Sequence, residues 1–515
     1  MTEPAYSLIY DHQNLGEVTL EVDPSALLET VSPVLNNPLN PSQENVFNYT
    51  FENRVTLLWG PPGTGKTTTL ASIVLGWIEY AIQNGIGLNI GVGSSTWTAI
   101  DNLLVDISDV LNRRRDLIGE FNIDVSVARI RSQSGTQFDN DQIEDLIVYS
   151  NSADVMKDRL DQNVNISICG STWKQFYNLS KNDRRSPAES KKWFDLLLID
   201  EASQVKVEHA AGYFLYLKEE GHLVLAGDDK QLGPIHGFQM EDHSEGLYDC
   251  IYTFMRETHG VTPQTIVDNY RSNLYINEWP NARFYNGNLT SQNPDNQLEI
   301  DLPESCPTDW PDSLIWNDKY LDILDPTKPI VVITYPASIH TVSNQFESQM
   351  TAGLTSLYKL SLTGQLENSE FVQKRIGIVT PHRAQRSQIQ NLLLSSDIEI
   401  EEAGFIDTVD RFQGQERDLI IASYSVSDKD FVGSEESFIL DPRRFNVSLT
   451  RAKSKFIMFV SEAIIDHLSN DKEIAEDAAH LQMFAIKYCK NERNFQLKYY
   501  EDGQEESFEC KMRTP

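Results

Sequence analysis

The chain has 515 residues, enough for two to four domains that each bury a core of their own. Its 76 acidic residues outnumber the 43 basic ones, and the net charge of -33 excludes a uniformly basic protein that coats nucleic acid or membranes. Hydrophobic residues make up 40% of the chain, which excludes a disordered protein, and no apolar run is long enough to predict a membrane-spanning helix.

Apolar runs recur along the chain, and each is followed by a loop and a helix-prone segment. Nearly continuous hydrophobicity is typical of parallel strands that are buried on both faces. We predict such strands at residues 55–59, 88–92, 166–169, 196–199, 222–226, 330–334, 376–379, 419–423 and 456–460. Strands that alternate with helices predict open α/β sheets, whose ligands bind beyond the carboxyl ends of the strands.

Four segments depart from this alternation and suggest the domain organisation. Residues 1–40 form an irregular leader before a first domain at 41–238. Within that domain, the polar and helix-prone residues 103–165 predict an inserted helical subdomain. An acid-rich stretch opens a second domain at 239–461, and residues 462–515 predict a polar, largely helical tail.

The most specific motif is a glycine-rich loop between the first predicted strand and a helix-prone segment. Its glycines let backbone N–H groups surround phosphate oxygens, its lysine reaches the β- and γ-phosphates, and the threonine after the lysine ligates Mg²⁺. A simple Gly/Pro turn would not need a Lys-Thr pair at its end. The motif therefore predicts an ATP and Mg²⁺ site formed by Gly60, Pro61, Pro62, Gly63, Thr64, Gly65, Lys66, Thr67 and Thr68.

A second motif, Asp200-Glu201-Ala-Ser-Gln, follows the apolar run at 196–199. A magnesium nucleotide needs an anchor on a neighbouring strand, and Asp200 would provide it, usually through water. Glu201 would then polarise the attacking water as a general base. Two acids at a strand end can also be a helix N-cap with a solvated neighbour, but the phosphate loop upstream favours hydrolysis.

A third motif, Gly-Asp-Asp-Lys-Gln-Leu-Gly-Pro at 227–234, follows the next predicted strand. The order of these three motifs resembles superfamily 1 helicases, specifically the up-frameshift-like group of nonsense-mediated decay and its DNA-acting relatives. Further segments that resemble motifs of this group lie at 40–43, 269–273, 284–289, 376–385, 408–418 and 443–452. The resemblance spans roughly residues 39–461.

This resemblance implies two RecA-like parallel-sheet domains with ATP in the cleft between them. Hydrolysis also needs positive charge on the departing γ-phosphate, for which Arg271 and Arg451 are the candidates. Taken singly, each arginine could instead form a structural ion pair. The resemblance further implies γ-phosphate sensing by Gln231, adenine stacking by Tyr270, adenine recognition by Gln43 and ribose contact by Glu416.

Nucleic acid would lie across both sheets, on the face away from ATP. The candidates that the resemblance implies are Ser94, Ser95, Thr96, Thr172, Thr380, Pro381, His382, Arg383, Arg386 and Thr408. The segment 93–102 departs from the sequence motif that is usual in the group, and Trp97 offers stacking in place of a polar contact. Basic clusters at 113–115, 129–131, 181–185 and 191–192 are either a track for phosphates or ordinary solvated faces.

We expect an ATP-dependent 5′→3′ helicase or translocase on single-stranded DNA or RNA. The alternative is a nucleic-acid-responsive ATPase switch that recruits a nuclease or another effector and unwinds little. A small-molecule kinase fits poorly, because Glu201 and two arginines suit water as the acceptor. The five cysteines are far apart, and the N-terminus lacks a signal-peptide pattern, so we expect reduced thiols, no zinc site and a cytoplasmic protein.

Overall fold

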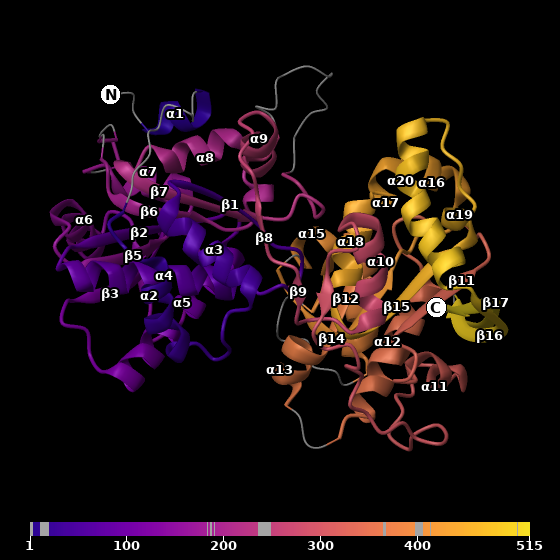
Figure 1. The fold of residues 1–515 in the computed structure, drawn as a ribbon. Coiled ribbons are helices and arrows are strands. Elements are labelled where there is room, and N and C mark those ends of the chain that lie inside the picture. The colour runs from indigo at the N-terminus through magenta and orange to yellow at the C-terminus, as the bar shows by residue number, and fades with distance from the viewer. Residues whose placement is uncertain are drawn as a thin grey trace. The chain divides into compact units, whose positions relative to one another are not determined.

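A computed structural model describes residues 4–10, 20–182, 184–185, 188–189, 191–234, 249–363, 367–396, 405–412, 414–501 and 503–515. The chain divides into two compact units, Met1–Asp268 (unit 1) and Asn269–Pro515 (unit 2). Each unit contains a sheet with helices on both faces (Figure 1). The expected α/β class with two parallel-sheet domains is therefore confirmed.

Unit 1 has an eight-stranded sheet over the described residues, and all its neighbouring strands run parallel. The strand order is β4-β3-β5-β2-β6-β7-β1-β8. The strands are β1 Val55–Trp59, β2 Leu88–Gly93, β3 Val125–Arg131, β4 Glu144–Ile147, β5 Ile166–Gly170, β6 Phe194–Ile199, β7 Leu217–Gly227 and β8 Gln264–Thr265.

The helices of unit 1 cover both faces of this sheet, and each face has its own apolar core. Helices α2 to α5 pack on one face, and α1 and α6 to α9 pack on the other (Figure 1). Burial on both faces explains why the strands are apolar throughout. The helices are α1 Pro4–Tyr10, α2 Pro24–Val31, α3 Pro41–Glu52, α4 Lys66–Asn84, α5 Trp97–Ile118, α6 Asn151–Gln162, α7 Trp173–Leu179, α8 Val207–Phe214 and α9 Ile251–Glu257.

Unit 2 has a seven-stranded sheet over its described residues, in the order β13-β12-β14-β15-β11-β17-β16. The first five strands are parallel, whereas β17 and β16 form an antiparallel hairpin that joins the sheet through β11. A separate short sheet contains β9 and β10. The strands are β9 Asp268–Asn269, β10 Thr290–Ser291, β11 Ile330–Tyr335, β12 Ile376–Thr380, β13 Ile406–Thr408, β14 Arg417–Ser423, β15 Ala452–Ser461, β16 Asn491–Glu501 and β17 Gln504–Thr514.

Helices of unit 2 also lie on both faces of its sheet (Figure 1). Helices α11, α12 and α14 contribute to a core that the hairpin β16–β17 extends. The helices are α10 Leu274–Phe284, α11 Lys319–Leu324, α12 Gln345–Leu360, α13 Asn368–Glu370, α14 Arg383–Leu394, α15 Val409–Phe412, α16 Lys429–Ser434, α17 Glu436–Ile439, α18 Pro442–Thr450, α19 Glu462–Ile465 and α20 Lys472–Met483. In the part of the chain that the structure describes, no helix combines the length and hydrophobicity needed to cross a membrane.

All nine predicted strands are present, but the predicted inserted helical subdomain at 103–165 is wrong. This segment contains β3 and β4, which extend the main sheet beyond β5, and only part of it is helical. The cause is that β3 carries Arg129 and Arg131. Both arginines are buried because they pair with carboxylates, so a buried strand has a polar sequence.

The predicted domain limits also need correction. The limit at 238/239 lies outside the described residues, as does Gln413 of the motif at 408–418. Residues 249–268 belong to unit 1, where β8 pairs with β1. The leader contains α1 and α2, which pack into the unit 1 cores, and the predicted helical tail ends in the hairpin β16–β17.

Candidate nucleotide and nucleic-acid sites

The phosphate loop connects β1 to α4 through Gly60, Pro61 and Pro62, as the sequence predicts. Gly63 and Gly65 have φ angles of 75° and 79°, a left-handed conformation that disfavours side chains. Gly65 is also the N-cap of α4, so the first backbone N–H groups of that helix face the loop. This geometry fits a site for phosphate oxygens.

Gln43 fixes the phosphate loop from the first turn of α3. Its side-chain Nε2 donates to the Thr64 carbonyl at 3.1 Å, and its Oε1 accepts from the backbone N–H of Asn40 at 3.0 Å. Gln43 is buried, and a Cβ on Gly65 would lie 2.6 Å from its Nε2. A side chain at position 65 would collide with Gln43, which is a second reason why this position needs glycine. The proposed contact of Gln43 with adenine stays a prediction.

Lys66 and Glu201 form the central ion pair of unit 1. Lys66 Nζ lies 3.2 Å from Glu201 Oε1, and their side chains are only 11% and 15% exposed. Lys66 begins α4 after β1, while Glu201 follows β6, two strands away in the sheet. Glu201 has a left-handed backbone at φ 50°, a conformation that costs energy and is enriched at functional sites.

The carboxylates around Lys66 decide its charge. Burial alone would lower the pKa of Lys66, but Glu201, Asp200 and Asp228 raise it above its ordinary value. Burial raises the pKa of Asp200 to about 6, although the positive charge of Lys66 opposes that rise. The lysine is therefore held as a cation, ready to neutralise phosphate charge.

Gln231 lies beside the third acid, which follows β7. The register aligns the ends of β1, β7 and β6, so Asp228 lies between the phosphate loop and Asp200. Gln231 Nε2 donates to Asp228 Oδ2 at 2.8 Å, and the residue Gln231 is 3% exposed. Both belong to the nucleotide edge of unit 1, the carboxyl ends of β1, β7 and β6.

The residues at this edge fit ATP and Mg²⁺. The loop presents backbone N–H groups, Lys66 presents a cation, and the acid Asp200 is buried beside them. Thr67 is half-buried in the first turn of α4, and Thr68 next to it is exposed. Oxygen atoms of Thr67 and Asp200 are of the kind that Mg²⁺ prefers, and Glu201 is close enough to Lys66 to act on the same phosphate.

The nucleic-acid candidates of unit 1 occupy the same sheet edge, further along. Ser95 and Thr96 follow β2, and Thr172 follows β5, its neighbour. Ser95 and Thr96 are exposed, and Thr172 is half-buried. The structure thus brings these three hydroxyl groups together beyond the nucleotide edge.

Tyr213 of α8 holds the two loops in place, which no sequence motif indicated. Its buried hydroxyl lies 2.9 Å from the Ser94 carbonyl and 3.0 Å from the Ser171 carbonyl. The ring also excludes a side chain at Gly93, where a Cβ would lie 2.6 Å from it. In the sequence, the glycine at position 93 indicates that another group packs closely there, but it does not identify that group as Tyr213.

In unit 2, Arg271 and Glu416 form an ion pair, with Arg271 Nε 2.6 Å from Glu416 Oε2. Arg271 and Lys453 lower the pKa of Glu416 to about 2, with Arg271 the larger cause. Arg451 is 3% exposed, and its Nε donates to the Val447 carbonyl at 3.2 Å. Tyr270, next to Arg271, is 43% exposed.

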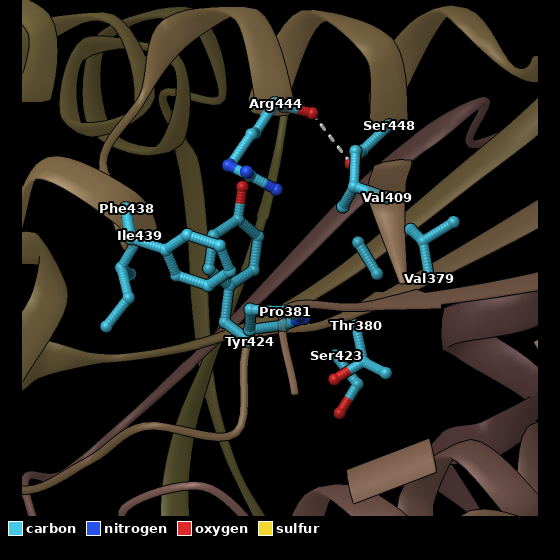
Figure 2. Close-up of a pocket in the computed structure, with 11 residues that line it drawn as sticks. Val379, Thr380, Pro381, Val409, Ser423, Tyr424, Phe438, Ile439, Arg444 and Ser448 are labelled. Atoms are coloured by element: carbon cyan, nitrogen blue, oxygen red, sulfur yellow. Dashed lines mark hydrogen bonds between the residues drawn. The ribbon is translucent and has the colours of Figure 1, made fainter. Parts of the chain in front are cut away.

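Thr380 and Thr408 are partners in the register of β12 and β13, so they lie side by side at the sheet edge of unit 2. Thr380 and Pro381 also line a narrow cleft with Tyr424, Phe438 and Arg444 (Figure 2), whose volume of about 20 Å³ is room for one water molecule. The hydroxyl of Thr380 is buried and has no hydrogen-bond partner among the described residues. The cleft therefore combines aromatic surface with a buried hydroxyl group.

Arg383 and Arg386 lie in the first turns of α14, directly after Pro381 and His382. Arg383 is exposed, whereas Arg386 is half-buried with its Nη1 3.5 Å from Asp407. His382 Nε2 lies 3.4 Å from Glu435, which fits polar lining better than metal binding.

A buried hydrogen-bond network behind this loop includes a carboxylate that the sequence analysis missed. Glu347 of α12 accepts from the hydroxyl groups of Tyr335 at 2.5 Å and Ser423 at 2.6 Å. Gln385 donates to Ser423 Oγ at 2.8 Å and accepts from the backbone of Asn344 at 2.7 Å. The network joins α12, α14 and β14, and so fixes the start of α14.

Three arginines of the predicted basic track are not available to phosphates. Arg114 pairs with Glu79 at 2.7 Å and is buried. Arg129 and Arg131 pair with Asp145, and Arg129 also lies over the ring of Trp97 at 4.3 Å. Trp97 thus packs against a buried arginine. Arg114, Arg129 and Arg131 stabilise the fold of unit 1, and the track hypothesis is wrong for these three residues.

Comparison with known proteins agrees with the order of the motifs. Two family models, each described as an AAA domain, match residues 38–175 and 251–463. The chain is 26% identical over 493 residues to the DNA polymerase alpha-associated DNA helicase A of Saccharomyces cerevisiae, which covers 86% of this chain and 68% of that protein.

Two further relatives are named for other activities. The DNA replication ATP-dependent helicase/nuclease DNA2 of Bos taurus is 25% identical over 480 residues, which cover 88% of this chain and 41% of the relative. The ATP-dependent helicase upf1 of Schizosaccharomyces pombe is 26% identical over 517 residues, which cover 94% and 50%. The chain thus spans half or less of the length of these two relatives.

Proposed function

The chain belongs to the superfamily 1 helicases of the up-frameshift-like group, and from this membership we propose that it is an ATP-dependent helicase or translocase. It would move 5′→3′ along single-stranded DNA or RNA. The observation that carries the proposal is the Lys66–Glu201 pair at 3.2 Å, beside Asp200. These groups share one sheet edge with the hydroxyl groups that follow β2 and β5.

The residues of unit 1 would perform the hydrolysis of ATP. The loop N–H groups and Lys66 would hold the β- and γ-phosphates, and Glu201 would accept a proton from the attacking water. Thr67 and Asp200 would hold Mg²⁺, which shields phosphate charge when bound. A buried cation and a carboxylate 3.2 Å apart support these roles.

Gln231 would sense the γ-phosphate, and Arg271 and Arg451 of unit 2 would supply positive charge as that phosphate departs. The buried guanidinium of Arg451 is hydrogen-bonded to main-chain carbonyl groups, which orients it. Tyr270 would stack on adenine, and its 43% exposure leaves ring surface for that purpose. Glu416 would contact the ribose.

Single strands would bind through Ser95, Thr96 and Thr172 in unit 1 and through Thr380, Pro381, Arg383, Arg386 and Thr408 in unit 2. Hydroxyl and guanidinium groups at strand ends suit phosphate contacts. Binding and hydrolysis of ATP would change the strength of these contacts in turn, which produces movement along the strand.

The test measures ATP turnover with single-stranded DNA and RNA of equal length, beside strand displacement from duplexes with a 5′ or a 3′ tail. The proposal expects stimulation by at least one nucleic acid and displacement only from the 5′-tailed duplex. Turnover that no nucleic acid stimulates would contradict it. Displacement from the 3′-tailed duplex alone would reverse the direction.

A second candidate function is a nucleic-acid-responsive ATPase switch that recruits a nuclease or another effector. The net charge of -33 and the internal pairing of Arg114, Arg129 and Arg131 favour it, because they leave few cations for a long track. Stimulated ATP turnover without any displacement would identify the switch.

A further inference from the structure

We propose that unit 1 has an additional binding site for single-stranded nucleic acid, a platform formed by Tyr149, Tyr177, Lys181 and Arg184. It would take bases on its rings and phosphates on its cations, beyond Thr172. The proposal rests on the function proposed above and extends it to a substrate site. The position of the platform follows from the strand order β2-β5-β3-β4 in the sheet of unit 1.

The strand ends place this platform in line with the predicted contacts. Arg131 pairs in register with Ile147, so β3 and β4 end at one level, and Gly170 pairs with Arg129, so β5 ends two residues earlier at the same edge. Neighbouring strands are about 4.8 Å apart, so the two steps from β5 to β4 extend the edge by roughly 10 Å. At ~3.4 Å per stacked nucleotide this is room for about three more nucleotides.

Helix α7 supplies the first part of the platform because it starts directly after Thr172. Phe176 and Leu179 face the core, and Tyr177 between them is 37% exposed. The ammonium group of Lys181, which follows the helix, lies 4.4 Å from the centre of the Tyr177 ring. A cation next to an exposed ring can bind a phosphate while the ring stacks on the adjacent base.

The ends of β3 and β4 supply the second part. Arg184 Nη2 donates to the side chain of Gln133, just after β3, at 2.8 Å. The guanidinium carbon of Arg184 lies 5.9 Å from the ring centre of Tyr149, just after β4. The Tyr149 hydroxyl donates to Asn178 of α7 at 3.2 Å, which ties the two parts together.

Charge distinguishes the platform from the other basic clusters of unit 1. Over the described residues, no carboxylate oxygen lies within 4.0 Å of the Lys181 ammonium or the Arg184 guanidinium. Arg129 and Arg131 on the adjacent strand are paired and buried. In a chain with a net charge of -33, two cations that have no carboxylate partner among the described residues and lie beside two rings favour an anionic, base-containing ligand.

The test uses the full chain and oligonucleotides of increasing length, with the double variant Tyr177→Ala/Lys181→Ala. The matched control is Tyr500→Ala/Lys472→Ala in unit 2, where Tyr500 is 38% exposed and Lys472 is 91% exposed. We expect the platform variant to bind long strands about ten-fold more weakly, the scale of one lost stacking contact. Its log–log salt slope should be shallower by about 0.7, the value for one phosphate contact.

The shortest strand that still stimulates ATP turnover should bind the platform variant as it binds the parent, because it does not reach beyond Thr172. Tyr177→Phe keeps the ring and should restore the affinity of a Tyr177→Ala variant, and melting temperatures identify any misfolded variant. Equal loss at all lengths, or no loss at any length, would overturn the platform. If the parent itself binds no single strand, the proposed function fails instead.

Discussion

Replacement of Glu201 by glutamine is the sharpest test of the nucleotide site. Glu201→Gln keeps the shape of the side chain and removes one negative charge 3.2 Å from Lys66 Nζ. At an effective dielectric constant of about 20, two unit charges at that distance attract by roughly 5 kcal/mol. The amide oxygen still accepts a hydrogen bond, which recovers about 1 kcal/mol of this attraction.

The variant has two consequences for catalysis. The general base is lost, so single-turnover hydrolysis should slow by about 10³, which corresponds to about 4 kcal/mol of barrier. The site also has one negative charge less for an anionic nucleotide to meet, so ATP affinity should rise by up to about ten-fold. Lys66→Ala should change ATP affinity in the opposite direction: the variant should lose nucleotide affinity, and turnover should be lost with it.

The assay combines equilibrium binding of ATP with rapid-quench hydrolysis for the parent and both variants. Melting temperatures should agree within a few degrees for Glu201→Gln, because the smaller cost of burying a neutral amide offsets most of the attraction to Lys66 that the variant loses. Turnover of Glu201→Gln close to that of the parent would refute Glu201 as the base. Loss of ATP binding in that variant would refute the separation of binding from hydrolysis.

Three further variants test other parts of the molecule. Arg451→Ala should lower ATP turnover by about 10³ with a far smaller change in nucleotide affinity, the pattern of a lost arginine finger; unchanged turnover would make its hydrogen bond to Val447 purely structural. Arg383→Ala should make the salt slope of single-strand binding shallower by about 0.7, and salt-independent binding of the parent would contradict a translocase. Burial lowers the pKa of Lys455 to about 7, so the free energy of unfolding should rise by about 1.4 kcal/mol per pH unit between pH 7 and 10.5, where only the unfolded chain holds the proton. Urea titrations at several pH values should find this slope in the parent and lose it in Lys455→Met; equal slopes would refute the burial of a neutral amine.

The sequence by itself determined the parts of this protein that depend on neighbours along the chain. A parallel strand buried on both faces is an apolar run, so all nine predicted strands are present. The phosphate loop depends on glycines within a few residues of each other, and Gly63 and Gly65 have the positive φ angles that their positions require. The order of the motifs then indicated the family.

Tertiary structure decided where polar residues can be buried. Arg129 and Arg131 made β3 appear to be a solvated helix, because their partners Asp101 and Asp145 lie elsewhere in the chain. The hairpin β16–β17 could not be predicted from the sequence for a similar reason. Exposed charged residues interrupt its apolar positions, and only its pairing with β11 places Leu497 in the core.

The contacts that position the sites are equally long-range. Gln43 could be assigned to adenine from its motif, but its hydrogen bond to Thr64 exists only once α3 packs beside the phosphate loop. Tyr213 joins the loops after β2 and β5 from a helix more than a hundred residues beyond Ser94. A short motif specifies its own backbone, whereas a buried polar group is stable only when folding brings its partner within hydrogen-bond distance, and the identity of that partner is a property of the packed chain.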